Sequence, residues 1–297
     1  MGMNAAPLLE PAFLAQLDRL SLVSRRMRAG QIQGERRSPK QGGSVEFADF
    51  RSYTPGDDFR QIDWNAYARL ERLFLKLFVA EEDITVHFLL DASQSMAWGE
   101  PQKWRYAQRL AAALGYVALA GMDRVTGAVL HSAHGPLAFF RPRRGKRQAL
   151  AWFHWLANAP LGGPLEPQAA LRAYLTQANH PGPLVLVSDL LGPGWPEGIR
   201  ALAGRRYEVT VLHLLSPQEA HPDLQGDLRL VDSETGAAVE VTADYDLLQR
   251  YGARLAAWRG EWQSACQAVG ARYAFIETGQ PLEALVLATL RRYDVVR

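Results

Sequence analysis

The sequence holds little of what stabilises proteins outside the cell or anchors them in a bilayer. Cys266 is the one cysteine among 297 residues, so no disulfide can form within the chain. A single thiol fits a reducing compartment. No apolar run approaches the roughly 18 residues that define a candidate membrane-spanning helix. Glu10, Asp18 and Arg19 interrupt the apolar N-terminal residues, whereas the core of a signal peptide is continuous. We therefore expect a cytoplasmic protein without a membrane span.

A strong excess of charge and the motifs of common enzymes are also missing. The chain carries 33 Lys and Arg against 31 Asp and Glu, and this formal net charge of +2 is too small to imply a nucleic-acid partner. We interpret the basic run at 141–147 as a solvated loop. The sequence has neither a P-loop motif nor a zinc-spaced Cys/His cluster. Neither an ATPase nor a zinc enzyme is therefore expected.

From residue 84 to residue 297, predicted strands and helices alternate. The run at 183–190 is nearly all apolar, which is typical of a strand buried on both faces of a parallel sheet. This order predicts a three-layer, doubly wound, mostly parallel α/β sheet of the Rossmann-like class. Alternating residues on both sides of Ser-Glu-Thr-Gly predict a hairpin insertion at 226–241. Strands are expected at 84–90, 124–130, 136–140, 183–190, 207–215 and 272–277, and helices at 103–119, 146–159, 167–178, 195–204, 244–268 and 281–292.

Residues 1–83 are predicted to form a smaller N-terminal region before the α/β domain at 84–297. Apolar residues at helical spacing predict an amphipathic helix at 10–28, and a basic connection follows at 29–45. The segment 46–70 combines near-balanced charge with aromatic residues. We interpret it as a charge-paired element whose aromatic side chains pack onto the main domain, with partner docking as the alternative. These aromatic residues are Phe47, Phe50, Tyr53, Trp64 and Tyr67.

Polar side chains follow two of the predicted strands at the point where each strand ends. Asp91, Ser93 and Ser95 follow the first strand, and Ser188 and Asp189 end the fourth. In the doubly wound order 3-2-1-4-5-6 these strands are neighbours, so their polar ends converge at the point where strand order reverses. Hydroxyl and carboxylate oxygens suit Mg²⁺, Mn²⁺ or Ca²⁺. The alternative is that Asp91 and the serines only cap the next turn.

Longer stretches of sequence carry a family resemblance. Asp91-x-Ser93-x-Ser95 after an apolar strand resembles the metal-ion-dependent adhesion site of a von Willebrand factor type A domain. Residues 46–74 and 231–241 resemble signatures of the bacterial family called domain of unknown function 58. The resemblance implies a type A domain after a family-specific N-terminal region. It also implies work beside a MoxR-type AAA+ ATPase, and a bound ion whose coordination a partner's carboxylate completes.

One departure from the type A pattern weakens the expected metal site. The loop before the fourth strand of such domains usually supplies a threonine, and the matching position here is Pro164, which has no hydroxyl. We expect Asp91, Ser93, Ser95 and Asp189 to hold Mg²⁺ or Mn²⁺ with reduced affinity, because Mg²⁺ retains waters readily. The leading hypothesis is thus a non-enzymatic interaction module.

Two alternatives to this module remain open. One is a structural adaptor with a vestigial metal site, and the other is a metal-dependent hydrolase that uses Asp91. A phosphatase of the haloacid dehalogenase type would need an aspartate where Ser93 stands, and neither serine has the G-x-S-x-G context of a hydrolase nucleophile. His87 and Cys266 are interpreted as packed residues rather than catalytic ones.

Overall fold

The computed structural model describes residues 7–22, 45–54, 57, 59, 62–80, 84–131, 137–178, 180–293 and 295–296. The chain divides into two compact units, Met1–Ser24 with Ile84–Arg297, and Arg25–Asp83. The first unit is called the α/β domain below. The basic connection expected at 29–45 lies outside the described residues, except for Val45.

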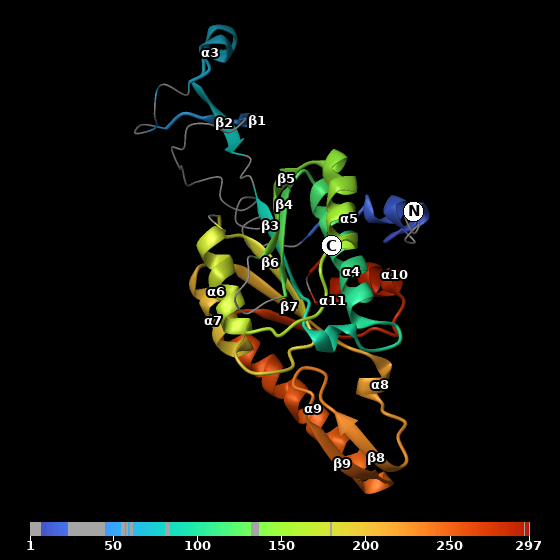
Figure 1. The fold of residues 1–297 in the computed structure, drawn as a ribbon. Helices are drawn as coiled ribbons and strands as arrows, with labels where there is room; N and C mark the ends of the chain where they lie inside the picture. The colour runs from blue at the N-terminus through green and yellow to red at the C-terminus, as the bar shows by residue number, and fades with distance from the viewer. Residues whose placement is uncertain are drawn as a thin grey trace. The chain divides into compact units, whose positions relative to one another are not determined.

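A six-stranded sheet forms the centre of the α/β domain (Figure 1). Its order is β10-β7-β6-β3-β4-β5, in which β5 runs antiparallel to β4 and every other pair is parallel. Numbered along the chain, this is the order 3-2-1-4-5-6, and the predicted doubly wound sheet is confirmed. The strands are β3 (Thr85–Asp91), β4 (Arg124–Leu130), β5 (Ala138–Arg144), β6 (Pro183–Ser188), β7 (Glu208–Leu215) and β10 (Arg272–Glu277).

Helices cover both faces of this sheet because its central strands are apolar on both sides. Phe88 and Leu90 of β3 belong to one buried cluster and Leu89 to the other, as the alternation of side chains along a strand requires. The first cluster includes residues of α4 (Lys103–Ala120) and α5 (Ala149–Ala157). The second includes residues of α6 (Pro167–Gln177), α7 (Trp195–Gly204) and α9 (Tyr245–Ala268).

The helix near the N-terminus belongs to the α/β domain and not to a separate N-terminal region. It runs only from Pro11 to Leu17 (α1), and Phe13 and Leu17 are buried in the first cluster. Tyr116 of α4 donates a hydrogen bond of 2.8 Å from its hydroxyl to Asp18 Oδ1. The structure therefore divides the predicted region 1–83, because the apolar face of α1 is buried against the core of the α/β domain.

Shorter elements complete the domain. The hairpin of β8 (Gly226–Val231) and β9 (Ala238–Ala243) forms a sheet of its own. The helix expected at 281–292 is instead a sequence of α10 (Leu282–Ala284), a π-helical turn η4 (Leu285–Thr289) and α11 (Leu290–Arg292). Short helical segments are η2 (Gln94–Ala97), η3 (Lys146–Gln148) and α8 (Pro217–Ala220). Across the described ranges, no helix combines the length and apolar character needed to cross a bilayer.

The second unit contains β1 (Val45–Ser52), α3 (Trp64–Leu70) and β2 (Phe74–Ala80), with β1 and β2 antiparallel. Its charges pair locally, since Arg51 Nη2 lies 2.7 Å from Asp57 Oδ1. Trp64 and Tyr67 are exposed and contact each other edge to face, with ring centroids 6.2 Å apart. Both belong to α3, in which no residue is buried, and the packing of this segment's aromatic side chains onto the α/β domain stays a prediction.

Candidate functional site

The ends of β3 and β6 meet at the same edge of the sheet. The two strands pair in parallel up to Leu90 and Val187, which places Asp91 next to Ser188. The Ser188 hydroxyl donates a hydrogen bond of 2.6 Å to Asp91 Oδ2, and both side chains are buried. The prediction that these two strand ends are neighbours is confirmed. We call the cluster of Asp91, Ser93, Ser95, Ser188 and Asp189 the strand-end site.

The loop after β3 folds its serines back toward Asp91. The Ser93 amide donates to Asp91 Oδ1 at 2.9 Å, and the Ser93 and Ser95 hydroxyl oxygens lie 3.1 Å apart. Gly162 donates from its amide to the carbonyl of Ala92 at 2.8 Å, so the loop before α6 braces this turn. Three of the predicted residues thus come together in a buried turn with two adjacent hydroxyl groups.

Asp189 completes the strand-end site from β6. Its side chain is fully buried; Oδ1 accepts from the Leu191 amide at 3.2 Å, and Oδ2 accepts from the Lys103 ammonium at 2.8 Å. Burial, and then the negative charge of Asp189, raises the pKa of Asp91 to about 7. The negative charge of Asp189 disfavours the ionisation of Asp91, so an internal cation stabilises this pair of buried carboxyl groups.

Lys103 supplies that cation, and the sequence analysis missed it. It is the first residue of α4, and its side chain has no exposed surface. Its ammonium contacts both Asp189 and Glu219. Burial alone lowers the pKa of Lys103, but the charges of Asp189 and Glu219 outweigh burial and raise it, so the side chain is charged. A positive charge at a helix N-terminus opposes the helix dipole, and this unfavourable position is the one signal in the sequence by which Lys103 could have been found.

Glu219 is held in place by its own local motif. It lies at the third position of α8, and its Oε2 accepts from the Ser216 amide at 2.7 Å and from the Ser216 hydroxyl at 2.9 Å. Ser216 in turn accepts from the Glu219 amide, which completes a capping box. Gly99 lies against this box at a φ of 100°, where a Cβ would come within 2.5 Å of Ser216 Cβ. Only glycine fits this close approach.

A second residue that the sequence analysis missed reaches the site from the hairpin. The Ser95 amide donates a hydrogen bond of 2.7 Å to Oε1 of Glu234, which lies 139 positions further along the chain at the tip between β8 and β9. Only the Ser-Glu-Thr-Gly turn was recognisable from sequence. Nothing local predicts that its glutamate reaches the loop after β3.

The donor atoms of the strand-end site fit a hard divalent cation, but a positive charge, the Lys103 ammonium, already contacts one of its carboxylates. Serine hydroxyls and aspartate carboxylates suit Mg²⁺ or Mn²⁺. Within the described part of the chain, no group of three or more His, Cys, Asp or Glu could hold a metal ion, so a cation here would depend on the serines. Each of the four oxygens of Asp91 and Asp189 already accepts a hydrogen bond from the protein, and one of these donors is the Lys103 ammonium.

The other two residues considered in the sequence analysis, His87 and Cys266, lie outside the strand-end site. His87 is buried in β3, where its ring nitrogens lie 2.6 Å from the Tyr174 hydroxyl and 2.8 Å from the His180 carbonyl. Burial lowers its pKa to about 4, and the prediction of a packed histidine is confirmed. Cys266 is likewise buried, which raises the pKa of its thiol to about 11.

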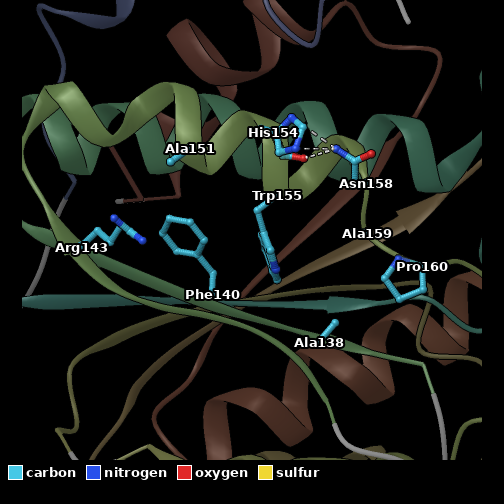
Figure 2. Close-up of a pocket in the computed structure, with 9 residues that line it drawn as sticks. All are labelled: Ala138, Phe140, Arg143, Ala151, His154, Trp155, Asn158, Ala159 and Pro160. Carbon is cyan, nitrogen blue, oxygen red and sulfur yellow. Dashed lines mark hydrogen bonds between the residues drawn. The ribbon is translucent and has the colours of Figure 1, made fainter. Parts of the chain in front are cut away.

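A cavity of about 380 Å³ lies between the edge strand β5 and α5, away from the strand-end residues (Figure 2). Figure 2 shows Phe140 and Trp155 facing into it from the strand and the helix. His154 also lines it, and the His154 carbonyl accepts a hydrogen bond of 2.7 Å from Asn158 Nδ2. No aspartate or glutamate lies among the lining residues. The lining residues are Ala138, Phe140, Arg143, Ala151, His154, Trp155, Asn158, Ala159 and Pro160.

Comparison with known proteins identifies relatives in sequence, similar solved structures and a matching family model. Uncharacterized proteins of Mycobacterium tuberculosis and Mycobacterium bovis are 28% identical over 277 residues, which cover 91% of this chain and 86% of each relative. Similar solved structures include BatB from Bacteroides thetaiotaomicron, at 15% identity and a TM-score of 0.40 over 71% of this chain and 98% of that one. The pilus adhesin SpaC from Lactobacillus rhamnosus GG has 11% identity and a TM-score of 0.43 over 72% of this chain and 31% of that one. The family model described as "Protein of unknown function DUF58" matches residues 49–261, and the chain belongs to this family.

Proposed function

We propose that the chain is a non-enzymatic protein-interaction module that binds its partner at the strand-end site. The observation that carries this proposal is the convergence of two carboxylates and three hydroxyls where β3 and β6 end. Ligand sites of open α/β sheets form at this edge, outside the carboxyl ends of the strands. The hydroxyls pair with carboxylates or with each other, and not with a histidine base, so the arrangement suits binding better than nucleophilic attack.

The proposed partner is a MoxR-type AAA+ ATPase, which contributes an acidic side chain to the contact. This choice follows from the family resemblance, and the module would then couple the ATPase to a client protein. We also propose that the chain lies in the cytoplasm, because such an ATPase hydrolyses the ATP of that compartment.

The proposed cation is Mg²⁺ or Mn²⁺, held by Asp91, Ser93, Ser95 and Asp189. When bound, it would supply the positive charge that attracts a partner's carboxylate. The chain's own residues orient the donors: Ser188 fixes the carboxylate of Asp91, and Lys103 fixes that of Asp189. Pro164, at the position expected for a threonine ligand, leaves this set one hydroxyl short.

A pull-down from native lysate, with and without EDTA, tests the partner. Recovery of a MoxR-type ATPase that is lost on chelation supports the full proposal, and no recovery under either condition refutes the partner. Calorimetry with Mg²⁺ and Mn²⁺ tests the cation: wild-type protein should release heat of binding and Asp91→Ala should not. Asp223→Ala, which removes an exposed acid before β8, is the matched control. Equal heats for all three proteins would refute the cation.

The buried ion pair of Lys103 favours a second candidate, a cation-free adaptor. The ammonium already neutralises Asp189 at 2.8 Å and contacts Glu219. In that case the same face binds its partner without a divalent ion. Recovery of the ATPase that is indifferent to EDTA, together with an absence of calorimetric heat, would select this candidate.

A further inference from the structure

The tip of the β8–β9 hairpin presents an acidic side chain to the strand-end site. Glu234 Oε1 accepts the Ser95 amide at 2.7 Å, and the Ser95 hydroxyl lies 3.1 Å from that of Ser93. A carboxylate of the same chain therefore contacts the very turn to which the proposed function assigns a partner's carboxylate.

The tip is built to hold Glu234 in this position. Asp232 Oδ1 accepts from the amides of Glu234 and Thr235, both at 2.8 Å, and these bonds lower the pKa of Asp232. The Gly236 amide donates to the Asp232 carbonyl at 2.8 Å, and Gly236 has a φ of 73°, which glycine adopts without strain. The turn is thus ordered by its own bonds, and these orient Glu234 whether or not Ser95 is reached.

The rest of the hairpin is loosely attached to the domain. It lies beside α9 (Figure 1). From Gly226 to Thr242 every residue is exposed except Leu228 and Val241, which are half-buried, and Ala243 is buried at the end of β9. Segments that bury little apolar surface open at low free-energy cost. The hairpin can therefore leave the site without unfolding the sheet.

We propose that Glu234 is a built-in ligand of the strand-end site, which occupies the Ser95 amide until an acidic side chain of a partner displaces it. This inference rests on the proposed function, because it concerns the same binding face. The tether gives Glu234 a high effective concentration, so a free carboxylate competes at a disadvantage. If the hairpin is closed nine-tenths of the time, the apparent dissociation constant of a competitor rises roughly tenfold.

Nuclear magnetic resonance of the full chain tests the proposal, with acetate as the probe and EDTA present throughout. The Ser95 amide signal is followed during acetate titration of the wild type, of Glu234→Ala and of the control Glu240→Ala. The control removes the same charge from an exposed position in β9, on the stem of the hairpin. Without acetate, Glu234→Ala should also speed hydrogen exchange at the Ser95 amide, because its acceptor is lost.

The expected result is an acetate response about tenfold stronger in Glu234→Ala than in the wild type or the control. Equal responses in all three proteins would overturn the proposal, and so would a Ser95 signal that ignores acetate in each of them. Neither measurement uses the ATPase or a divalent cation. A positive result without any ATPase capture would therefore sustain this inference while refuting the proposed partner.

Discussion

Replacement of Lys103 by methionine should destabilise the α/β domain strongly. The change keeps an unbranched side chain of similar length but removes the charge that lies 2.8 Å from Asp189 Oδ2, where neither side chain has exposed surface. Removal of one partner from a buried ion pair typically costs about 3–5 kcal/mol, because the other charge stays buried and unpaired. For a domain of this size, such a loss lowers the melting temperature by roughly 10 °C.

Thermal unfolding monitored by circular dichroism, with and without MgCl₂, measures this effect. If a divalent cation and the ammonium both neutralise Asp189, then Mg²⁺ should raise the melting temperature of Lys103→Met more than that of the wild type. A ligand at about 100 times its dissociation constant stabilises by about 2.7 kcal/mol, which would recover much of the loss. The double variant Lys103→Met/Asp189→Asn should be more stable than Lys103→Met alone, since the side chain at position 189 is then neutral.

Lys146→Met is the matched control for this experiment. Lys146 also pairs with an aspartate, Asp18, at 2.8 Å, but both side chains are substantially exposed. Solvent screens such pairs, so the control should change the melting temperature little. A Lys103→Met protein that melts within about 2 °C of the wild type, equivalent to less than roughly 1 kcal/mol, would refute the reasoning that the buried ammonium stabilises the site.

Two further substitutions, one in β3 and one beside α8, test the packing of the α/β domain. The pKa of His87, lowered to about 4 by burial, means that this side chain binds a proton more readily in the unfolded chain than in the folded one between pH 6.5 and 4. The contribution of His87 to stability should therefore fall by up to about 3 kcal/mol as pH drops through this window. Urea titrations measure it as the difference between the wild type and His87→Gln, because Asp91 and His213 titrate in both proteins. Gly99→Ala should cost more than about 2 kcal/mol from positive φ and the clash with Ser216, whereas Gly204→Ala, with open space around it, should be near neutral in the same assay.

The sheet and its strand order were predictable because local pattern and general topology rules agree. β3 and β6 are buried along their whole length, and such apolar strands between amphipathic helices define a doubly wound sheet. Once that order holds, Asp91 and Ser188 have to meet at one edge, and their hydrogen bond at 2.6 Å follows. Long-range geometry was accessible here because it is a consequence of topology rather than of individual side chains.

The partners of the site were not predictable in this way. Lys103 reads as one more basic residue at the start of an amphipathic helix, and its burial depends on Asp189 and Glu219, which lie 86 and 116 positions away. Glu234 reads as a turn residue, since its contact with Ser95 depends on where a loosely attached hairpin folds back. Side-chain contacts between residues so far apart leave no periodic pattern in the sequence, so only the three-dimensional structure reveals them.

The arrangement also explains why the two candidate functions share one face. The Lys103 ammonium binds the strand-end site from the Asp189 side, while Ser93 and Ser95 pair with each other on the Asp91 side. The ammonium neutralises part of the negative charge and does not contact the hydroxyls of Ser93 and Ser95. A hydroxyl oxygen that takes part in one hydrogen bond keeps a lone pair for a cation. The Ser95 amide, which already donates to the carboxylate of Glu234, belongs to the same turn as these two hydroxyls. Under the proposed function, a partner's acidic side chain would be recognised there with or without a divalent ion, and the ion would change the affinity rather than the place of binding.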